Sequence, residues 1–379
     1  MPNTLTATLP KIFGQALPTL RQSAITPRLV NSRHSQGPGQ HFKTVDIPVP
    51  QAQTAGAVTS AITVPANTDH TTSTVQVVLD QWYSTRFHLD DQQQTQIDAG
   101  ATFVPAQLGE AIKAVGNQID TSLLTKGSLV GYSAGTAGTT PFASESTFNS
   151  NYTAGARKIL NDNLAPSSDR FVVMDADAEG NLVSLAKFTD ADRVGDTMGI
   201  REGEIGRKLG STWFLNQNVV THTSSGSTGN LINDAAHAVG ATDLDIDGGT
   251  GTIIVGDLIT IAGDTQTYSV TSVTGSAPAT NVGIFPASKV ALADDAAVTV
   301  VASRDVNLAF HRDAFALAFA SFAPVDPALG VVATSITDPV TGVTMRLQVR
   351  REYMQTTWEV DALWGVKDVR PELACQILG

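Results

Sequence analysis

The residue best suited by its type to nucleophilic chemistry is Ser133, the centre of a G-x-S-x-G sequence at residues 131–135. In an α/β-hydrolase this turn follows a buried strand and opens a helix, with an acid and a histidine later in the chain. His222, His237 and His311 lie downstream and are the candidate bases. The surroundings do not match, because a helical pattern precedes the serine and glycine-rich residues follow it. We therefore expect a loop, with no catalytic role for Ser133.

An alternating acidic stretch imitates the first half of a calcium-binding loop. Asp243, Asp245 and Asp247 precede Gly248, but position twelve of such a loop needs a bidentate carboxylate, and Ile254 stands there. The alternation favours a strand with three exposed carboxylates; weak calcium binding is the alternative. The chain also lacks an H-E-x-x-H sequence, and one cysteine cannot form a thiolate zinc cluster. The sequence therefore predicts no catalytic, cofactor-binding or metal site.

The charge balance argues against a dedicated nucleic-acid-binding domain. The 379 residues contain 36 Asp+Glu against 24 Lys+Arg, a formal net charge of −12. Tight binding of nucleic acid relies on basic side chains that neutralise phosphates, so only weak contact with enclosed DNA is compatible. Charged residues make up 16% of the chain, below the roughly 25% of ordinary globular domains. This composition suits either a subunit largely covered by other subunits or a repetitive β-rich surface protein.

Neither a disulfide nor a membrane anchor is expected. Cys375 is the single cysteine, so the chain cannot form an internal disulfide. Residues 1–14 lack the charged start and long apolar core of a signal peptide. No stretch approaches the ~18 apolar residues of a membrane span. We therefore expect a soluble intracellular protein without membrane contact.

The first third of the chain predicts an arm, a ribbon and a long helix. Two prolines interrupt the mildly amphipathic residues 10–33, so these residues form an arm that packs against another element. Alternating residues 43–50 and 73–79 predict a two-stranded excursion, which is marginal alone in water. One helix is predicted over residues 104–126, with Pro105 at its start and Gly127 just past its end, from a helical stripe of apolar residues: Leu108, Ile112, Val115, Ile119 and Leu123.

The middle of the chain contains an abrupt change of composition. A second helix is predicted over residues 144–163, and strands over residues 170–174 and within 208–222, around Trp213, Phe214 and Val219. A Ser/Gly-rich run follows at Thr223, and Lys289 is the only Lys or Arg from there to residue 302. Short strands at 258–261 and 268–273 indicate a hairpin-rich β module. Because the earlier composition returns after Arg304, residues 223–303 are interpreted as an insertion.

The C-terminal stretch, residues 307–379, predicts a sheet. Phe315, Leu317 and Phe319 share one face of a strand. Residues 343–349 and 356–361 predict a pair of strands. Basic and acidic side chains can pair across these strands: Arg346, Arg350, Arg351, Glu352, Glu359 and Asp361.

The order of these parts resembles that of the major capsid proteins of tailed bacteriophages, in particular the coat proteins of short-tailed phages. Residues 16–34 with Lys43-Thr-Val-Asp-Ile-Pro-Val-Pro50 resemble the family's arm and extended loop, and residues 108–124 resemble its spine helix. Gly203-Glu-Ile-Gly-Arg-Lys-Leu-Gly210 with Phe214-Leu-Asn-Gln-Asn218 is similar to its central strand region. The C-terminal likeness lies in residues 307–315, Trp358-Glu-Val-Asp-Ala-Leu-Trp-Gly365 and Arg370-Pro-Glu372.

The resemblance implies an α+β fold of the HK-ninety-seven capsid type. This fold has an N-terminal arm, an extended β loop, a long spine helix, and peripheral and axial domains, here with an inserted all-β domain. The implied division is an arm at 1–36, an extended loop at 37–85, the spine helix with the first part of the peripheral and axial domains at 86–222, the insert at 223–304, and the C-terminal part of the core at 305–379.

The function implied by the resemblance is structural, and the chain is expected not to be an enzyme. Copies would self-assemble as pentamers and hexamers into an icosahedral shell that contacts double-stranded DNA weakly and without sequence preference. A scaffolding protein and a portal are implied partners, and the implied location is the virion capsid, with the host cytoplasm during assembly. The alternatives are an encapsulin-like shell around protein cargo, a β-rich surface adhesin, and a hydrolase that uses Ser133.

Overall fold

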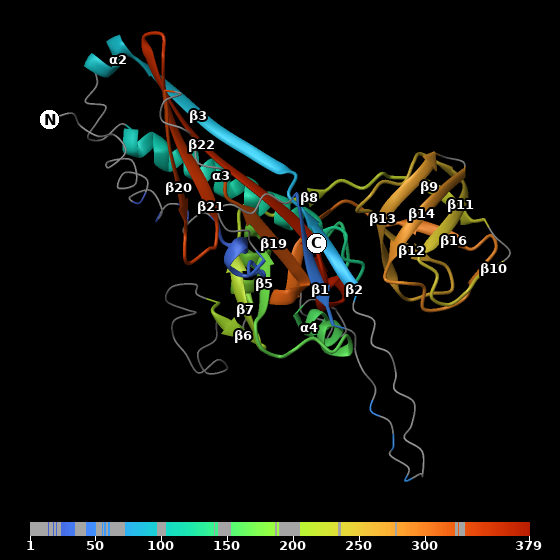
Figure 1. Cartoon of the computed structure of the whole chain (residues 1–379). Coiled ribbons are helices and arrows are strands. Elements are labelled where there is room, and N and C mark those ends of the chain that lie inside the picture. The colour runs from blue at the N-terminus through green and yellow to red at the C-terminus, as the bar shows by residue number, and fades with distance from the viewer. Residues whose placement is uncertain are drawn as a thin grey trace.

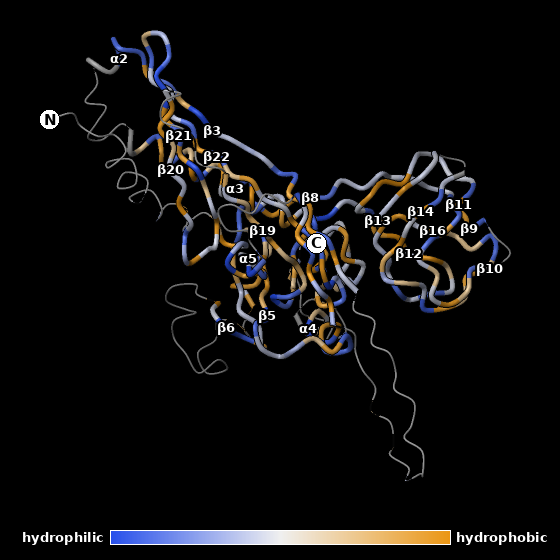
Figure 2. The backbone as a smooth tube through the Cα atoms, viewed as in Figure 1, coloured by the Kyte–Doolittle hydropathy of each residue, from blue (hydrophilic) through white to orange (hydrophobic). Residues whose placement is uncertain are grey.

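The computed structural model shows a body built along one long helix, with a barrel at its side (Figure 1). The body contains a five-stranded sheet and a six-stranded sheet. Apolar residues concentrate where the helix meets these sheets (Figure 2). The structure describes residues 14, 18, 20, 24–34, 43–50, 55, 57, 60, 73–96, 104–139, 141–142, 153–185, 188, 205–233, 236–276, 279–322, 325 and 330–379.

Helix α3 (Val104–Gly127) is the axis of the body and confirms the predicted helix. It ends one residue later than predicted, because Gly127 is still helical. Gly127 lies against Leu308 so closely that a Cβ atom there would overlap the leucine side chain. All members of the predicted apolar stripe are buried in the main core: Leu108, Ile112, Val115, Ile119 and Leu123.

The five-stranded sheet lies along α3, and its central strand is β22 (Gln355–Asp368). Strand β21 pairs with β22 in the register Arg346↔Asp361, which confirms the predicted strand pair. Strand β3 pairs with the first part of β22, and α2 (Asp91–Gln96) follows β3. The other strands of this sheet are β19 (Phe315–Ala320), β20 (Val331–Thr337), β21 (Thr344–Glu352) and β3 (Gln81–Asp90).

Strand β19 separates two apolar clusters. Its phenylalanine and leucine side chains face the main core, as predicted, whereas Ala316, Ala318 and Ala320 face the other way. The small alanine side chains leave room for the ribbon of β1 (Thr44–Val49) and β2 (Ser73–Val78). The ribbon is two-stranded, as predicted, and its base is packed on the body.

The six-stranded sheet forms the lower part of the body, in the order β4-β23-β18-β5-β7-β6. The strand predicted at 170–174 is confirmed as β5. The strand predicted within 208–222 is confirmed around Trp213 and Phe214, but Val219 lies outside it. Helix α4 covers the second half of the helix predicted at 144–163, whose residues 144–152 lie outside the described residues. The elements are β4 (Ser133–Gly135), β5 (Arg170–Met174), β6 (Arg207–Lys208), β7 (Ser211–Leu215), β18 (Asn307–His311), β23 (Ala374–Leu378), α4 (Thr153–Asp162) and α5 (Ala176–Ser184).

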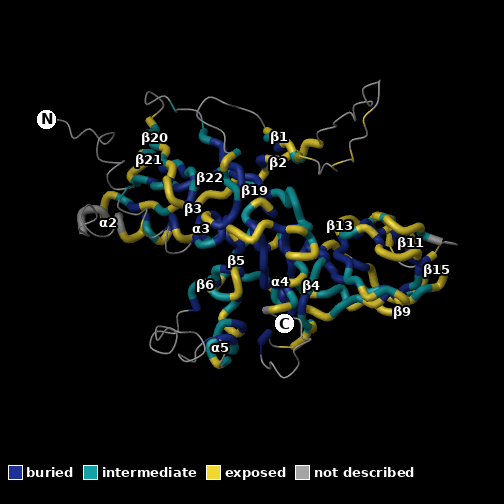
Figure 3. Tube along the Cα trace, turned by 90° about the horizontal axis from the view of Figure 1, so that it is seen from below, coloured by how far each residue is buried: buried dark blue, intermediate teal, exposed yellow. Residues whose placement is uncertain are grey.

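The barrel is closed, in the strand order β11-β14-β13-β12-β16-β9, and has an apolar core of its own. The strands predicted at 258–261 and 268–273 are confirmed as β12 and part of β13. Figure 3 shows the barrel beside the body, with buried residues inside each. The strands are β9 (Thr228–Ile232), β11 (Asp243–Thr250), β12 (Leu258–Ile261), β13 (Thr267–Ser276), β14 (Ala279–Phe285) and β16 (Ala297–Val300), with the small pair β10 (Ala236–His237) and β15 (Leu292–Ala293).

Short elements complete the described chain. Strands β8 (Thr221–His222) and β17 (Arg304–Asp305) pair with each other where the chain enters and leaves the barrel. The 3₁₀ turn η1 (Thr26–Arg28) lies against α3. Two further 3₁₀ turns are η3 (Arg312–Ala314) and η5 (Pro371–Leu373).

Candidate assembly surfaces and the barrel junction

The environment of Ser133 does not resemble a hydrolase site. Ser133 begins β4, a short edge strand parallel to β23, so the prediction of a loop is wrong for these three residues. Its Oγ atom lies 2.7 Å from Oγ1 of Thr267 in the barrel. The candidate histidines are engaged elsewhere: His222 with Asp257, His237 with the amide of Asp245, and His311 with the amide of Asp313.

The acidic stretch is a strand, as predicted. On β11 the side chains of Asp243 and Asp245 are exposed, and Leu244 and Ile246 are buried in the barrel; the third predicted exposed carboxylate, Asp247, is half-buried. The amide of Asn281 donates to Asp245 at 2.8 Å, which occupies one carboxylate oxygen. Within the described ranges no group of three or more His, Cys, Asp or Glu side chains is arranged to hold a metal ion.

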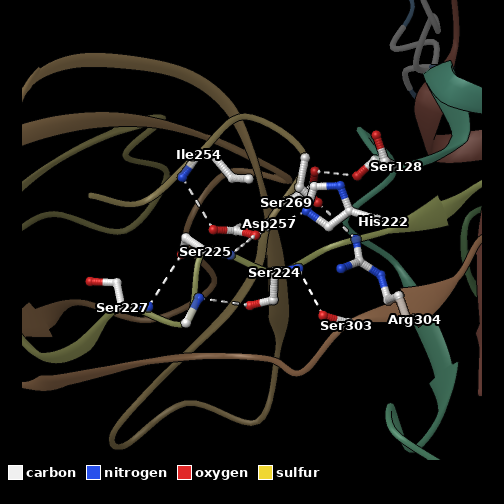
Figure 4. Close-up of polar contacts among 12 residues, drawn as sticks. Ser128, His222, Ser224, Ser225, Ser227, Ile254, Asp257, Ser269, Ser303 and Arg304 are labelled. Atoms are coloured by element: carbon white, nitrogen blue, oxygen red, sulfur yellow. Dashed lines mark hydrogen bonds and ion pairs between the residues drawn. The ribbon is translucent and has the colours of Figure 1, made fainter. Parts of the chain in front are cut away.

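Polar contacts join the barrel to the body around Arg304, which is almost completely buried (Figure 4). Its Nε donates to Oε1 of Gln376 in the body at 2.9 Å, and its Nη2 donates to the carbonyl of Gly256 in the barrel at 2.8 Å. Burial lowers the pKa of Arg304 to about 10, and nearby Asp257 partly opposes this. A single guanidinium therefore bridges the two parts of the molecule.

Asp257 is the acidic counterpart at this junction and is fully buried. Burial raises its pKa, but hydrogen bonds from His222, Ser225 and Ile254 outweigh burial and leave the pKa below the ordinary value. His222 Nε2 lies 2.9 Å from an Asp257 oxygen. This pair does not form a catalytic triad with Ser128, because the Ser128 hydroxyl donates to the carbonyl of Thr125 at 2.8 Å.

Two further contacts make the barrel junction close-fitting. The hydroxyl of Ser269 donates to the carbonyl of Ser128 at 2.9 Å, and that of Thr267 donates to the carbonyl of Gly131 at 3.0 Å. Gly131 lies so close to the carbonyl of Phe285 that a Cβ atom at this position would overlap it. The glycine that starts the G-x-S-x-G sequence therefore serves packing.

Neither Arg304 nor Asp257 is a candidate from sequence alone. The one signal for Arg304 is its position as the first basic residue after a long stretch with a single lysine. Asp257 stands in a Gly-Asp pair that otherwise indicates a turn.

The ribbon carries the first candidate assembly surface. Ile47, Val77 and Leu79 cover the alanine face of β19. Gly365 permits this approach, because a Cβ atom there would overlap the carbonyl of Val78. Beside the base, a polar groove of about 420 Å³ lies between β2, α3 and β22, and Lys126 and Lys367 are among its lining residues. The ribbon is therefore fixed to the body at its base.

A second candidate surface follows strand β3 and the open face of the five-stranded sheet. The Trp82 side chain is 63% exposed, and its Nε1 donates to Asp361 at 3.1 Å. Arg346 donates two hydrogen bonds to the same carboxylate and lies over the ring of Phe322, 3.9 Å from its centroid. Exposed tryptophan is typical of the residues that dominate protein interfaces, whereas the Arg346 side chain is only 12% exposed. The predicted cross-strand pairing is thus confirmed for Arg346 with Asp361.

No model of a protein family matches this sequence, and no curated protein matches it. Solved structures resemble it. A chain from Mycobacterium phage Che8 is 17% identical, with 94% of this chain and 91% of that chain covered and a TM-score of 0.50. A chain from the capsid of the cyanophage P-SCSP1u is 12% identical, with 94% and 88% covered and a TM-score of 0.51.

The chain has the phage capsid fold. The likeness confirms the predicted capsid type of fold, with helices and sheets combined. Helix α3 occupies the residues of the predicted spine helix, and the two strands of the ribbon lie within the residues of the predicted extended loop. Strand β3 runs without a break across residue 85, where the extended loop was expected to end. In the described part of the chain, no helix is long and apolar enough to cross a membrane.

Proposed function

We propose that this chain is the major capsid protein of a tailed bacteriophage, whose copies assemble into an icosahedral shell around double-stranded DNA. The observation that carries the proposal is the capsid fold, since the likeness to the cyanophage capsid chain extends over 94% of this chain. The interactions of such a subunit are structural, and the proposal assigns it no enzymatic step.

The ribbon supports assembly as the function. An isolated two-stranded ribbon is marginally stable in water, so a long one is better explained if neighbouring molecules cover it. Residues 50–72 connect its two strands and include a single charged residue, Asp69, which suits burial against another subunit. The contacts at the ribbon base fix the direction in which it leaves the body.

We propose the domain division given by the sequence: an arm at 1–36, an extended loop at 37–85, the spine helix and first core part at 86–222, an inserted barrel at 223–304, and the remaining core at 305–379. The pairing of β8 with β17 supports an insertion, because it brings the ends of the barrel segment together. The contacts of Arg304 support a barrel that is fixed to the body rather than loosely tethered.

We place the barrel on the outer side of the shell. Residues 223–304 contain eight aspartates and no glutamate against Lys289 and Arg304, a formal charge of −6 and half of the −12 of the chain. Packaged phosphates would repel such a charge at close range. Phage DNA is therefore expected to contact the body, weakly and without sequence preference.

The remaining partners belong to the same proposal. Copies of the chain form pentamers and hexamers, a scaffolding protein guides them, and a portal occupies one vertex. Assembly takes place in the host cytoplasm, and the final location is the virion capsid. An encapsulin-like shell around protein cargo is the alternative within the same fold, and the contents of purified shells distinguish the two.

A shortened ribbon tests the proposal. Replacing residues 50–72 with Asn-Gly connects β1 and β2 by a two-residue hairpin turn. The variant keeps Ile47, Val77 and Leu79, which pack on the body. We expect this variant to remain a folded subunit but to form no shells when co-expressed with a candidate scaffolding protein, whereas the unchanged chain forms them. Normal shells from the shortened variant would contradict the role of the ribbon. Unchanged chain that stays monomeric with scaffold would contradict the proposed function.

A further inference from the structure

Asp120 is a fully buried carboxylate in the second half of the spine helix α3. Among the described residues it forms no ion pair with a lysine or arginine. Burying an uncompensated carboxylate is costly, and such a group persists in a fold when hydrogen bonds satisfy its oxygens. The capsid fold and its proposed function leave the presence of this residue unexplained.

Three donors from two distant parts of the chain satisfy the carboxylate. The backbone amides of Ile25 and Thr26 donate to Oδ2 and Oδ1, each at 3.2 Å. The side-chain amide of Asn216 donates to Oδ2 at 2.9 Å. The same Asn216 amide also donates to the hydroxyl of Thr26 at 3.0 Å, so the donors are linked to one another.

These donors come from elements that are far apart in the sequence. Ile25 and Thr26 open the 3₁₀ turn η1, whose first amides have no partner within the turn. Asn216 follows β7, and its backbone amide donates to the carbonyl of Met174 in β5. Asp120 therefore joins the N-terminal segment, the spine helix and the six-stranded sheet.

Apolar packing also holds the N-terminal segment against the main core, but it defines the path of the backbone less sharply than hydrogen bonds do. Ala24, Leu29 and Val30 are buried in the main core. Burial of apolar surface is non-directional, whereas hydrogen bonds to a charged acceptor require a defined geometry. A little further on, Asn31 is hydrogen-bonded to Phe315 and Leu317 of β19. The carboxylate is thus the directional contact that holds Ile25 and Thr26 on the spine helix.

We propose that Asp120 is a positioning residue, whose carboxylate sets the path of the N-terminal segment across the spine helix. The contact would hold residues 24–34 in one position on the body, and so set where the arm of the subunit meets a neighbouring copy. This last step rests on the proposed function, whereas the positioning itself is a property of the single subunit.

The protonation state fits this role. Burial raises the pKa of Asp120 to about 6, and hydrogen bonds from Asn216, Ile25, Asn218 and Thr26 oppose that rise. The group is therefore ionised at neutral pH, when it can accept from all three donors. An asparagine in its place would direct an NH₂ group at one of these donors, so at least one donor would lose its partner.

Amide hydrogen exchange of the unassembled subunit tests the proposal. We expect the peptide that contains Ile25 and Thr26 to exchange at least tenfold faster in Asp120→Asn than in the unchanged chain, while peptides from β22 exchange at the same rate. The matched control is Asp162→Asn, which removes one negative charge from exposed helix α4 and should alter neither peptide. Equal protection of Ile25 and Thr26 in Asp120→Asn would overturn the proposal.

A second variant covers the case in which Asp120→Asn fails to fold. Asn216→Ala keeps the carboxylate and removes one of its donors, so we expect a smaller acceleration in the same peptide. The backbone amide of Asn218, which donates to Oδ1 of Asn216 at 2.9 Å, should also exchange faster in this variant. An unchanged rate at Ile25 and Thr26 in Asn216→Ala would then count against the proposal. These measurements use single subunits, so a negative exchange result would contradict the positioning role of Asp120 but not the proposed capsid function. Conversely, the absence of shells would contradict the capsid function but not the positioning role.

Discussion

Replacing Arg304 with methionine perturbs the junction between barrel and body while keeping an unbranched side chain of similar length. The guanidinium is 1% exposed and bridges Gln376 of the body and Gly256 of the barrel. Methionine would leave Oε1 of Gln376 and the carbonyl of Gly256 without these donors. Each buried acceptor left without a partner costs about 1–3 kcal/mol. The favourable electrostatic interaction of Arg304 with Asp257 would also be lost.

The relief of desolvation offsets part of this loss, because burying a guanidinium is itself expensive. We therefore expect Arg304→Met to lower the free energy of unfolding of the single subunit by about 2–4 kcal/mol. Urea unfolding followed by tryptophan fluorescence measures this change. Limited proteolysis provides a second signal, since cleavage between residues 223 and 227 should become faster when the barrel is held less firmly.

The matched control is Arg351→Met, which removes the same charge from an exposed site. Arg351 pairs with Asp91 near the far end of β21, with both side chains about half exposed. An exposed ion pair contributes little, so we expect the urea midpoint to stay unchanged. The reasoning is refuted if Arg304→Met loses less than about 1 kcal/mol, the size of an ordinary substitution, and its proteolysis pattern matches that of the control.

Three other predictions concern the ribbon, the serine motif and pH. Leu79→Ala should loosen the ribbon by about 2–4 kcal/mol, seen as faster amide exchange in β1 and β2 but not in β12; equal exchange would contradict the packing argument. Ser133→Ala should leave shell yield unchanged, and loss of an esterase activity would revive the hydrolase alternative. Burial raises the pKa of Asp120 to about 6, so the folded state binds an extra proton between about pH 4 and 6. The contribution of Asp120 to stability should therefore fall as pH rises through 6, and Asp120→Asn should flatten this dependence in urea titrations.

Much of the fold could be predicted because its elements are periodic. The stripe along α3 and the alternation in β19 each point one set of apolar side chains into the core, so spacing alone identified them. The strand pair β21 and β22 carries matching charges, and its register places Arg346 opposite Asp361. The two-stranded ribbon followed from alternation and from small residues between its strands.

The contacts between distant segments could not be predicted, because no local pattern records them. No sequence motif marks Arg304 or Asp257, because their contacts form only where the barrel packs against the body. Asp120 sits in a helical stretch where a polar residue usually faces solvent, yet the N-terminal segment covers it. Short strands such as β4 and β6 depend on pairing with their neighbours in the six-stranded sheet, and two or three residues carry too little periodicity to predict a strand.

Negative-stain electron microscopy of the purified chain, with and without a co-expressed candidate scaffolding protein, tests the central claim most directly. The account predicts closed or partial shells, or rings of five and six subunits, and shells purified from infected cells should contain DNA rather than a protein cargo. A chain that stays strictly monomeric under all these conditions would contradict assembly as its function.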